Sequence, residues 1–443
     1  MKLLQFLLCM ALLCVSGSPA FAMDTAERLN VLEKAIKEQA RIIEEQQRTI
    51  ESMKEEINSR KTEEAAAPEA LPVKTEEDSS LASKVSGFFG GSALTNPNIS
   101  LVVDTFGYTS NLKKEELEER GIEQRKGFNL RAAELFLFAP VDSYFNLYGA
   151  FPITEDGIEL EEAFAVTTSL PFGFQVKGGK FKSNFSRLDA QHPHAWDFAD
   201  IALPYKAFLG EEALGGEKGV QVTWLPPLPF YTLLGGEILQ GENGNLFGAD
   251  AGSGPHAYTL FAKTSFDTGD NSSLLFGPYV LFGKAHQPSE EGFDFRGNSN
   301  LWGVEAVWKW KEGKQGVTLQ GEYLHLSQSG NEISDPETGD TISRRLRRDG
   351  AYIQALYRYD RWRVGARYDR LDLFSDSLKL GGEEQDLGKT PWRTTASLEF
   401  NPSEFSRIRL QYTHDRSSRE GRENNEWWLQ FIFGIGAHGA HEF

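Results

Sequence analysis

The chain has 443 residues, a formal net charge of −18 and 43 glycines. An acidic chain without a basic patch is a poor partner for nucleic acid, so we expect no such partner. Beyond residues 1–22 no apolar run reaches the length that a membrane-spanning helix needs, which excludes a helical membrane protein. A transmembrane β-barrel hides its apolar residues in alternation and therefore fits this composition.

Residues 1–22 have the pattern of a secretory signal peptide. A lysine opens the segment, residues 3–15 are apolar, and Ala20 and Ala22 form a small-x-small cleavage site. The mature chain is therefore expected to begin near Met23. Both cysteines of the chain lie in the signal, so we expect neither disulfides nor thiolate metal sites in the mature protein.

A heptad repeat follows over residues 23–61. Its core positions step by three and four residues, at Leu29, Leu32, Ile36, Gln39, Ile43, Gln46, Ile50, Met53 and Ile57. This pattern predicts a periplasmic coiled coil that associates with copies of itself. Polar core residues such as Gln39 and Gln46 can fix register and oligomer state. Three strands suit the porin resemblance described below, and two strands are the alternative. Residues 62–90 are rich in Glu, Ala, Pro, Ser and Lys and predict a flexible linker.

Strand patterns alternate with turn signals from about residue 98 onward. We expect strands at 99–108, 128–138, 144–151, 158–168, 172–181, 220–225, 231–240, 257–266, 274–284, 301–310, 317–326, 351–359, 362–371, 392–400, 407–414 and 427–435. Short connections follow even strands and most long ones follow odd strands, as in transmembrane barrels. The predicted fold is all-β: residues 91–443 form a 16-stranded antiparallel transmembrane β-barrel, preceded by an N-terminal coiled-coil helix.

The last strand shows the alternation most clearly. Its outward face is expected to hold Trp427, Leu429, Phe431, Phe433 and Ile435. The chain then ends on Phe443, which resembles the ending of bacterial outer-membrane barrel proteins. That resemblance implies insertion into the outer-membrane lipid of a Gram-negative bacterium by the barrel-assembly machinery. The alternative is an ordinary sandwich strand with a chance terminal phenylalanine.

Two further stretches resemble known families. Residues 178–187, GGKFKSNFSR, resemble the phosphate-selective porin O and P family, in which a similar Gly-x-Phe-Lys-x-x-Phe stretch precedes a loop folded into the channel. Residues 191–214 and 436–443 resemble proteins labelled zinc-regulated TonB-dependent outer-membrane receptors, which implies uptake driven from the inner membrane. The chain has no room for a 22-stranded barrel or a globular plug, so the porin mechanism is favoured.

Residues 182–219 form the third outer loop of the predicted barrel. The loop contains Trp196, Phe198 and Tyr205, and a loop so rich in apolar residues is expected to pack against other parts of the protein. In porins the place to pack is the barrel interior, where the loop would narrow the lumen. An outer lid or a subunit-contact loop is the alternative.

Histidines in this loop and near the end of the chain are candidate metal ligands. His192 and His194 lie two residues apart and would point the same way on an extended segment, so they could share one zinc ion. Asp189 or Asp197 could supply a carboxylate, and the further histidines are His438 and His441. The alternative is that these histidines bind no metal.

Alternation in the last strands places several arginines on the inner wall. With charged residues of the third loop and its neighbours they form the expected pore lining: Lys180, Lys182, Arg187, Arg358, Arg363, Arg367, Arg393, Arg407, Arg409, Glu159, Glu161, Asp197 and Asp200. Unpaired arginines would attract phosphate-like or carboxylate solutes. If the arginines are paired with acids they only fix the wall, and a cation preference would make the acidic residues the selectivity determinants.

No residue spacing typical of a nucleophile, a general base or an enzymatic metal centre occurs in the chain, so we expect neither an enzyme nor a cofactor. The sequence predicts a homotrimeric outer-membrane porin that passes small hydrophilic or anionic solutes by diffusion. Two alternatives remain. One is an outer-membrane receptor or uptake barrel linked to zinc or another metal. The other is a structural anchor whose coiled coil tethers periplasmic partners.

Overall fold

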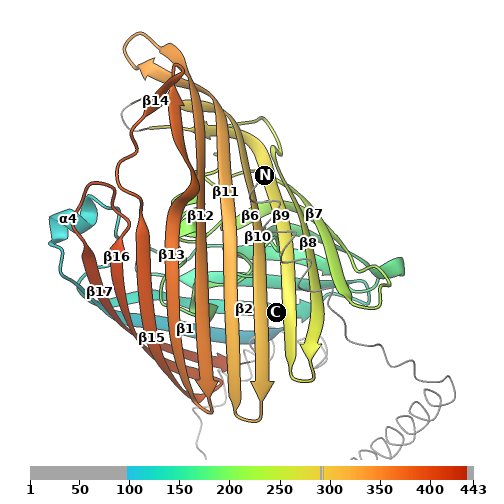
Figure 1. Ribbon diagram of the computed structural model, residues 1–443. Helices are drawn as coiled ribbons and strands as arrows, with labels where there is room; N and C mark the ends of the chain where they lie inside the picture. Colours follow the sequence, from blue (N-terminus) through green and yellow to red (C-terminus); the bar gives the residue numbers. More distant parts are fainter. Residues whose placement is uncertain (1–96, 290–291, 293, 437–443) are drawn as a thin grey trace, which may run out of the picture. The chain divides into compact units, whose positions relative to one another are not determined.

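A computed structural model describes residues 97–289, 292 and 294–436 (Figure 1). The predicted signal peptide, coiled coil and linker and the terminal Phe443 lie outside the described residues. The division of the chain into segments 1–22, 23–61, 62–90 and 91–443 therefore stays a prediction. Among the described residues, no helix is long and apolar enough to cross a membrane.

One antiparallel sheet accounts for nearly all regular structure of the described residues. Its strands are β1 (Asn98–Ser110), β2 (Gly127–Pro140), β3 (Phe145–Ile153), β4 (Glu162–Thr167), β5 (Phe174–Lys182), β6 (Gly216–Trp224), β7 (Tyr231–Leu239), β8 (Ala257–Gly269), β9 (Ser272–Gln287), β10 (Phe295–Glu312), β11 (Gln315–Asp335), β12 (Asp340–Tyr359), β13 (Trp362–Leu380), β14 (Glu383–Gln385), β15 (Trp392–Ser403), β16 (Ser406–Arg416) and β17 (Asn424–Gly436).

The sheet closes on itself. β17 pairs with β1, from Ser100 opposite Gly436 to Ser110 opposite Glu426. β14 pairs only with the end of β13, which also pairs directly with β15. In the described part of the chain sixteen strands therefore form a closed antiparallel barrel, which confirms the predicted fold class for this region.

Alternation of exposed and buried residues shows which side of each strand faces outward. In β17 Trp427 and Leu429 are exposed, whereas Trp428 and Gln430 are buried. β10 follows the same pattern around the exposed Trp302. Every second residue of these strands faces outward, and many of these outward residues are large and apolar. Such a surface is stable against lipid and would cause aggregation in water. The outward face predicted for the last strand is therefore confirmed.

Strands β10 to β13 extend further than predicted, at the ends away from their two-residue turns. Their outer parts lack the regular apolar alternation of the inner parts, and β12 holds four arginines between residues 344 and 348. Backbone ladders and cross-strand ion pairs hold these parts instead; Arg344, for example, lies 2.9 Å from Glu332 of β11. Strand prediction from apolar alternation therefore stops where the regular apolar outward face stops.

The tight turns between strands lie at one end of the barrel. The β10–β11 and β12–β13 turns each use a left-handed residue, Gly313 and Asp360, with φ of 55° and 54°. Long connections lie at the other end. The first contains α4 (Lys114–Glu118), and its Leu112 and Leu117 pack on Phe106 and Trp428 of β1 and β17. This packing fixes the first connection at the edge of the barrel interior.

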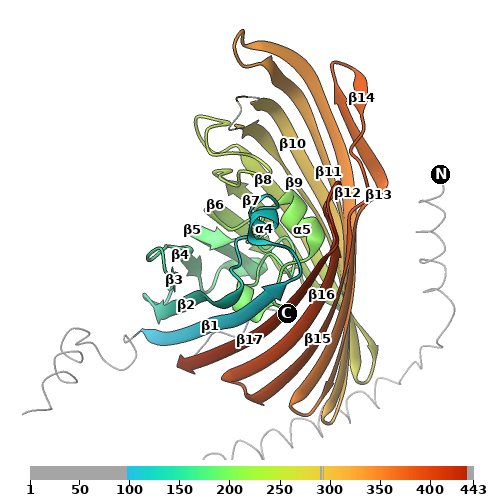
Figure 2. The same ribbon diagram turned by 90° about the vertical axis from the view of Figure 1, so that its left-hand side faces the viewer.

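The longest connection joins β5 to β6 and covers residues 183–215. It contains η2 (Pro193–Ala195) and α5 (Leu203–Phe208), and α5 contacts β12 and β13 (Figure 2). Phe185, Tyr205 and Phe208 are almost fully buried in one cluster with inward-facing residues of β7 to β13. This β5–β6 connection therefore packs against the inner face of those strands and forms an apolar core with them.

Candidate functional site

Two aspartates attach the β5–β6 connection to the barrel wall. The Asp197 carboxylate lies 2.7 Å from the guanidinium of Arg363, and the Asp200 carboxylate lies 2.7 Å from Arg393 and 3.1 Å from Arg367. Burial raises the pKa of Asp200, but Arg367 and Arg393 lower it more strongly, to about 2. Asp200 is therefore ionised at neutral pH, and these buried charges are compensated.

The neighbouring arginines are engaged in the same way. Arg409 is fully buried and donates to Glu399 at 2.9 Å and to the carbonyl of Trp196 at 2.8 Å. Arg407 lies 3.5 Å from Glu399 and donates to the carbonyl of His194 at 3.0 Å. The sequence predicted the inward direction of these side chains correctly. The idea of an unpaired positive wall is wrong, because acids pair with Arg363, Arg367, Arg393, Arg407 and Arg409.

The other basic residues of the expected lining do not make such a wall either. Lys182 is buried and lies 3.4 Å from a glutamate, and Arg187 lies 3.6 Å from an aspartate. Lys180 and Arg358 each donate to a backbone carbonyl, at 2.6 and 3.1 Å. The basic residues of the GGKFKSNFSR stretch thus bind the protein itself.

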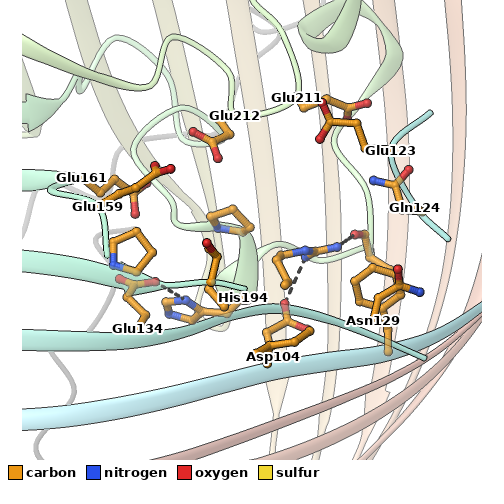
Figure 3. Close-up of a pocket in the computed structure, with 18 of the residues that line it drawn as sticks. Asp104, Glu123, Gln124, Asn129, Glu134, Glu159, Glu161, His194, Glu211 and Glu212 are labelled. Atoms are coloured by element: carbon orange, nitrogen blue, oxygen red, sulfur yellow. Dashed lines mark hydrogen bonds and ion pairs between the residues drawn. The ribbon is translucent and has the colours of Figure 1, made fainter. Parts of the chain in front are cut away.

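A cavity of about 550 Å³ lies beside the β5–β6 connection (Figure 3). Its wall is built mainly by β1, β2, the connections that follow β1 and β3, and the β5–β6 connection, with one residue each from β3, β5, β6 and β17. Carboxyl side chains of the described residues line it at ten positions: Asp104, Glu123, Glu134, Glu155, Asp156, Glu159, Glu161, Asp200, Glu211 and Glu212. The lysine and arginine residues of this lining are Arg125, Arg131 and Lys180. We call this cavity the acidic cup.

Some of these carboxylates are neutralised by pairing. Asp104 lies 3.1 Å from Arg131, and Glu211 is paired with Lys206. In the part of the chain that the structure describes, no lysine, arginine or histidine lies within ion-pair distance of four others: Glu123, Asp156, Glu159 and Glu212. Burial, and next the charge of Glu161, raise the pKa of Glu212. The cup therefore carries net negative charge.

A smaller cavity of about 280 Å³ adjoins the cup. The two share five lining residues: Gln124, Asp200, Ile201, Glu211 and Trp428. The smaller cavity continues along residues 119–122 of the first connection and residues 417–418 after β16. Both of these segments belong to the end of the barrel with long connections, so the cup extends toward that end.

The two histidines of the β5–β6 connection meet glutamates at one side of the cup. Nδ1 of His192 lies 3.1 Å from oxygens of both Glu134 and Glu161, and its Nε2 lies 2.9 Å from Glu162. Nδ1 of His194 lies 3.0 Å from Glu134, and the two rings stack at 5.7 Å. Burial lowers the pKa of His192, but Glu161 and its neighbours raise it to about 10.

The carboxylates next to the histidines differ from the expected ones. Asp189 accepts a hydrogen bond from the backbone of Leu214, and Asp197 pairs with Arg363. His438 and His441 lie outside the described residues. Sequence reasoning missed Glu134, although it is the sole acid in the apolar strand β2. An isolated inward acid of that kind is the signal that could have identified it.

Comparison with known proteins places the chain in a family. No family profile matches the sequence. An uncharacterized protein of Aquifex aeolicus (strain VF5) is 41% identical over 413 residues, which cover 85% of this chain and 86% of that protein. The chain belongs to the same family as this Aquifex protein.

Solved structures identify the fold of this family. The outer membrane channel DcaP of Acinetobacter baumannii shares 12% identity, covers 78% of this chain and 99% of its own, and gives a TM-score of 0.51. OprB of Pseudomonas putida (13% identity, 77% and 94% coverage) and an anion-selective porin from Comamonas acidovorans (10%, 77% and 100%) each give 0.50. The family therefore has the general fold of outer-membrane porins.

Proposed function

We propose that this chain is a porin of a Gram-negative outer membrane through which small hydrophilic solutes diffuse. The observation that carries the proposal is the acidic cup, a polar cavity on the inner side of a barrel whose outer face is apolar. Polar lumens with both signs of charge are what barrel channels use for diffusion. In this proposal the β5–β6 connection narrows the lumen and leaves the route along β1 to β4.

The charge of the route favours cations and neutral solutes over the anions that the sequence suggested. Anion preference required unpaired arginines, and these arginines are held by Asp197, Asp200 and Glu399. Phosphate selectivity would need Lys180, Lys182 and Arg187 to offer uncompensated charge to solute. Lys182 and Arg187 pair with carboxylates, and Lys180, at the wall of the acidic cup, donates to a backbone carbonyl. The carboxylates of the cup then decide the local potential.

The assembly state and topology complete the proposal. The heptad repeat of residues 23–61 supports a homotrimer with a periplasmic coiled coil, and Phe443 supports insertion by the barrel-assembly machinery.

Liposome swelling with neutral sugars of increasing size tests the route. We expect small sugars to enter and a sharp size limit, because the β5–β6 connection occupies part of the interior. If folded protein admits no sugar, the porin proposal fails and the barrel is an anchor for the coiled coil.

A further inference from the structure

We propose that Glu134, Glu161 and His192 bind one divalent transition-metal ion of the Zn²⁺ class at the wall of the acidic cup. The three residues come from β2, from the position directly before β4, and from the β5–β6 connection. One donor atom from each lies within 4.8 Å of the others. The fold thus brings together three ligands that are far apart in the sequence.

The spacing of the donors fits an ion between them. Zinc bonds of about 2.0–2.1 Å in a tetrahedral arrangement put neighbouring donors about 3.3 Å apart. Nδ1 of His192 lies 3.1 Å from Oε1 of Glu134 and 3.1 Å from Oε2 of Glu161. Nδ1 of His192 hydrogen-bonds to Glu161 and makes only an ion-pair contact with Oε1 of Glu134 in the described residues, whereas one ion can contact both oxygens directly.

Glu134 supplies a second, independent observation. Its side chain is 7% exposed, and its Oε1 makes no hydrogen bond in the described part of the chain. A buried carboxylate oxygen without a hydrogen bond is costly and needs compensation. The short approach to His192 is an ion-pair contact, and a metal ion at this point would compensate the oxygen directly.

The surrounding residues orient the proposed ligands. Oε2 of Glu162 lies 2.9 Å from Nε2 of His192 and holds a ring N–H on Nε2. An ion would displace the proton from Nδ1, which then becomes the donor to metal. His194 lies 3.0 Å from the second oxygen of Glu134, and Lys182 lies 3.4 Å from the second oxygen of Glu161. Such outer partners fix ligand geometry and balance charge.

The chemistry of the three ligands indicates which class of ion would bind, and the acidic cup gives that ion a path to the site. One imidazole with two carboxylates suits Zn²⁺ and similar ions, whereas Mg²⁺ and Ca²⁺ prefer oxygen ligands alone. Glu134 and Glu161 line the cup, so an ion can enter from it, and the remaining coordination position would face the cavity. An ion there would reduce the negative charge of the route, a consequence that rests on the proposed porin function.

The test measures binding directly on the full mature chain, folded in detergent and stripped of metal with a chelator. Calorimetric titration with ZnCl₂ should show one equivalent bound, and CoCl₂ should give the visible absorption of a four-coordinate site. Glu134→Gln and His192→Gln should each weaken Zn²⁺ binding by at least about 100-fold, because loss of an outer partner alone costs roughly 10- to 100-fold.

Glu159→Gln is the matched control, because it removes one negative charge from the same cup without removing a proposed ligand. We expect it to change Zn²⁺ affinity by no more than about twofold, the size of one screened surface charge. Absence of binding to the wild type would overturn the proposal, as would undiminished binding in both ligand variants or equal weakening in Glu159→Gln. Should Glu134→Gln not fold, His192→Gln decides. Zinc binding by a chain that conducts no ions would refute the porin function and leave the metal site standing.

Discussion

Charge selectivity of the acidic cup gives the sharpest prediction. In the described part of the chain four of its carboxylates have no cation within ion-pair distance: Glu123, Asp156, Glu159 and Glu212. Replacing all four by their amides keeps the shape of the side chains and removes their charge. Cation preference should then fall sharply, because the remaining acids of the cup are largely paired.

Elementary electrostatics gives the size of the effect. A monovalent ion about 8 Å from one carboxylate, which is one Debye length at physiological salt, gains about 0.5 kcal/mol in water and about 0.2 kcal/mol after screening. Four such groups give about 0.8 kcal/mol, which enriches cations about fourfold and depletes anions about fourfold. Permeability for K⁺ should therefore exceed that for Cl⁻ by about 15-fold, and each single amide should halve the ratio, roughly.

Reversal potentials in a KCl gradient across planar bilayers measure this ratio. The matched control removes four exposed carboxylates that do not line the cup: Asp270, Glu337, Glu383 and Glu404. The control should keep the wild-type reversal potential, while the cup variant should move toward zero. An anion-selective wild type, or a cup variant that is as selective as the wild type, would refute the reasoning.

Three further predictions concern the attachment of the β5–β6 connection, the pH dependence of selectivity and the predicted coiled coil. The double substitution Asp197→Asn, Asp200→Asn should remove carboxylate partners of Arg363, Arg367 and Arg393. It should lower the free energy of unfolding by about 3–5 kcal/mol per broken buried pair and raise conductance. Denaturant unfolding and bilayer recording check this, and unchanged values would contradict it. Cation preference should decline as pH falls from 8 to 4 in the presence of chelator. Glu212 should be protonated first, because a carboxyl with a raised pKa takes up its proton at higher pH. Reversal potentials measure this, and a constant preference over this range would contradict the role of the cup carboxylates in selectivity. Deletion of residues 23–61 should weaken trimer assembly and leave a heat-modifiable barrel, because a coiled coil on a flexible linker shares no core with the barrel. Light scattering in mild detergent measures the assembly state. A monomeric full-length chain would contradict the trimer.

The strands could be predicted from the sequence because their outward residues are apolar at every second position. Trp427, Leu429 and Phe433 alternate with buried residues, and the structure keeps that alternation through β17. The same parity predicted that Arg393 and Arg409 point inward. In the outer parts of β10 to β13 this apolar alternation ends, so the sequence pattern did not predict how far these strands extend.

The pairing of the inner residues could not be predicted in this way. Asp200 meets Arg367 and Arg393 only because the β5–β6 connection turns back onto strands more than 160 residues later in the chain. His192 likewise meets Glu134 of β2, and the spacing of the histidines carries no information about that partner. Contacts of this kind depend on barrel closure and on the path of one long connection, which local patterns do not encode.

Single-channel recording of the full mature chain in planar bilayers tests the porin function most directly. A water-filled route along the acidic cup predicts discrete conductance steps that grow with KCl concentration and are smaller than those of the Asp197→Asn, Asp200→Asn variant. Folded, membrane-inserted protein that gives no steps at any voltage or salt concentration would contradict the account.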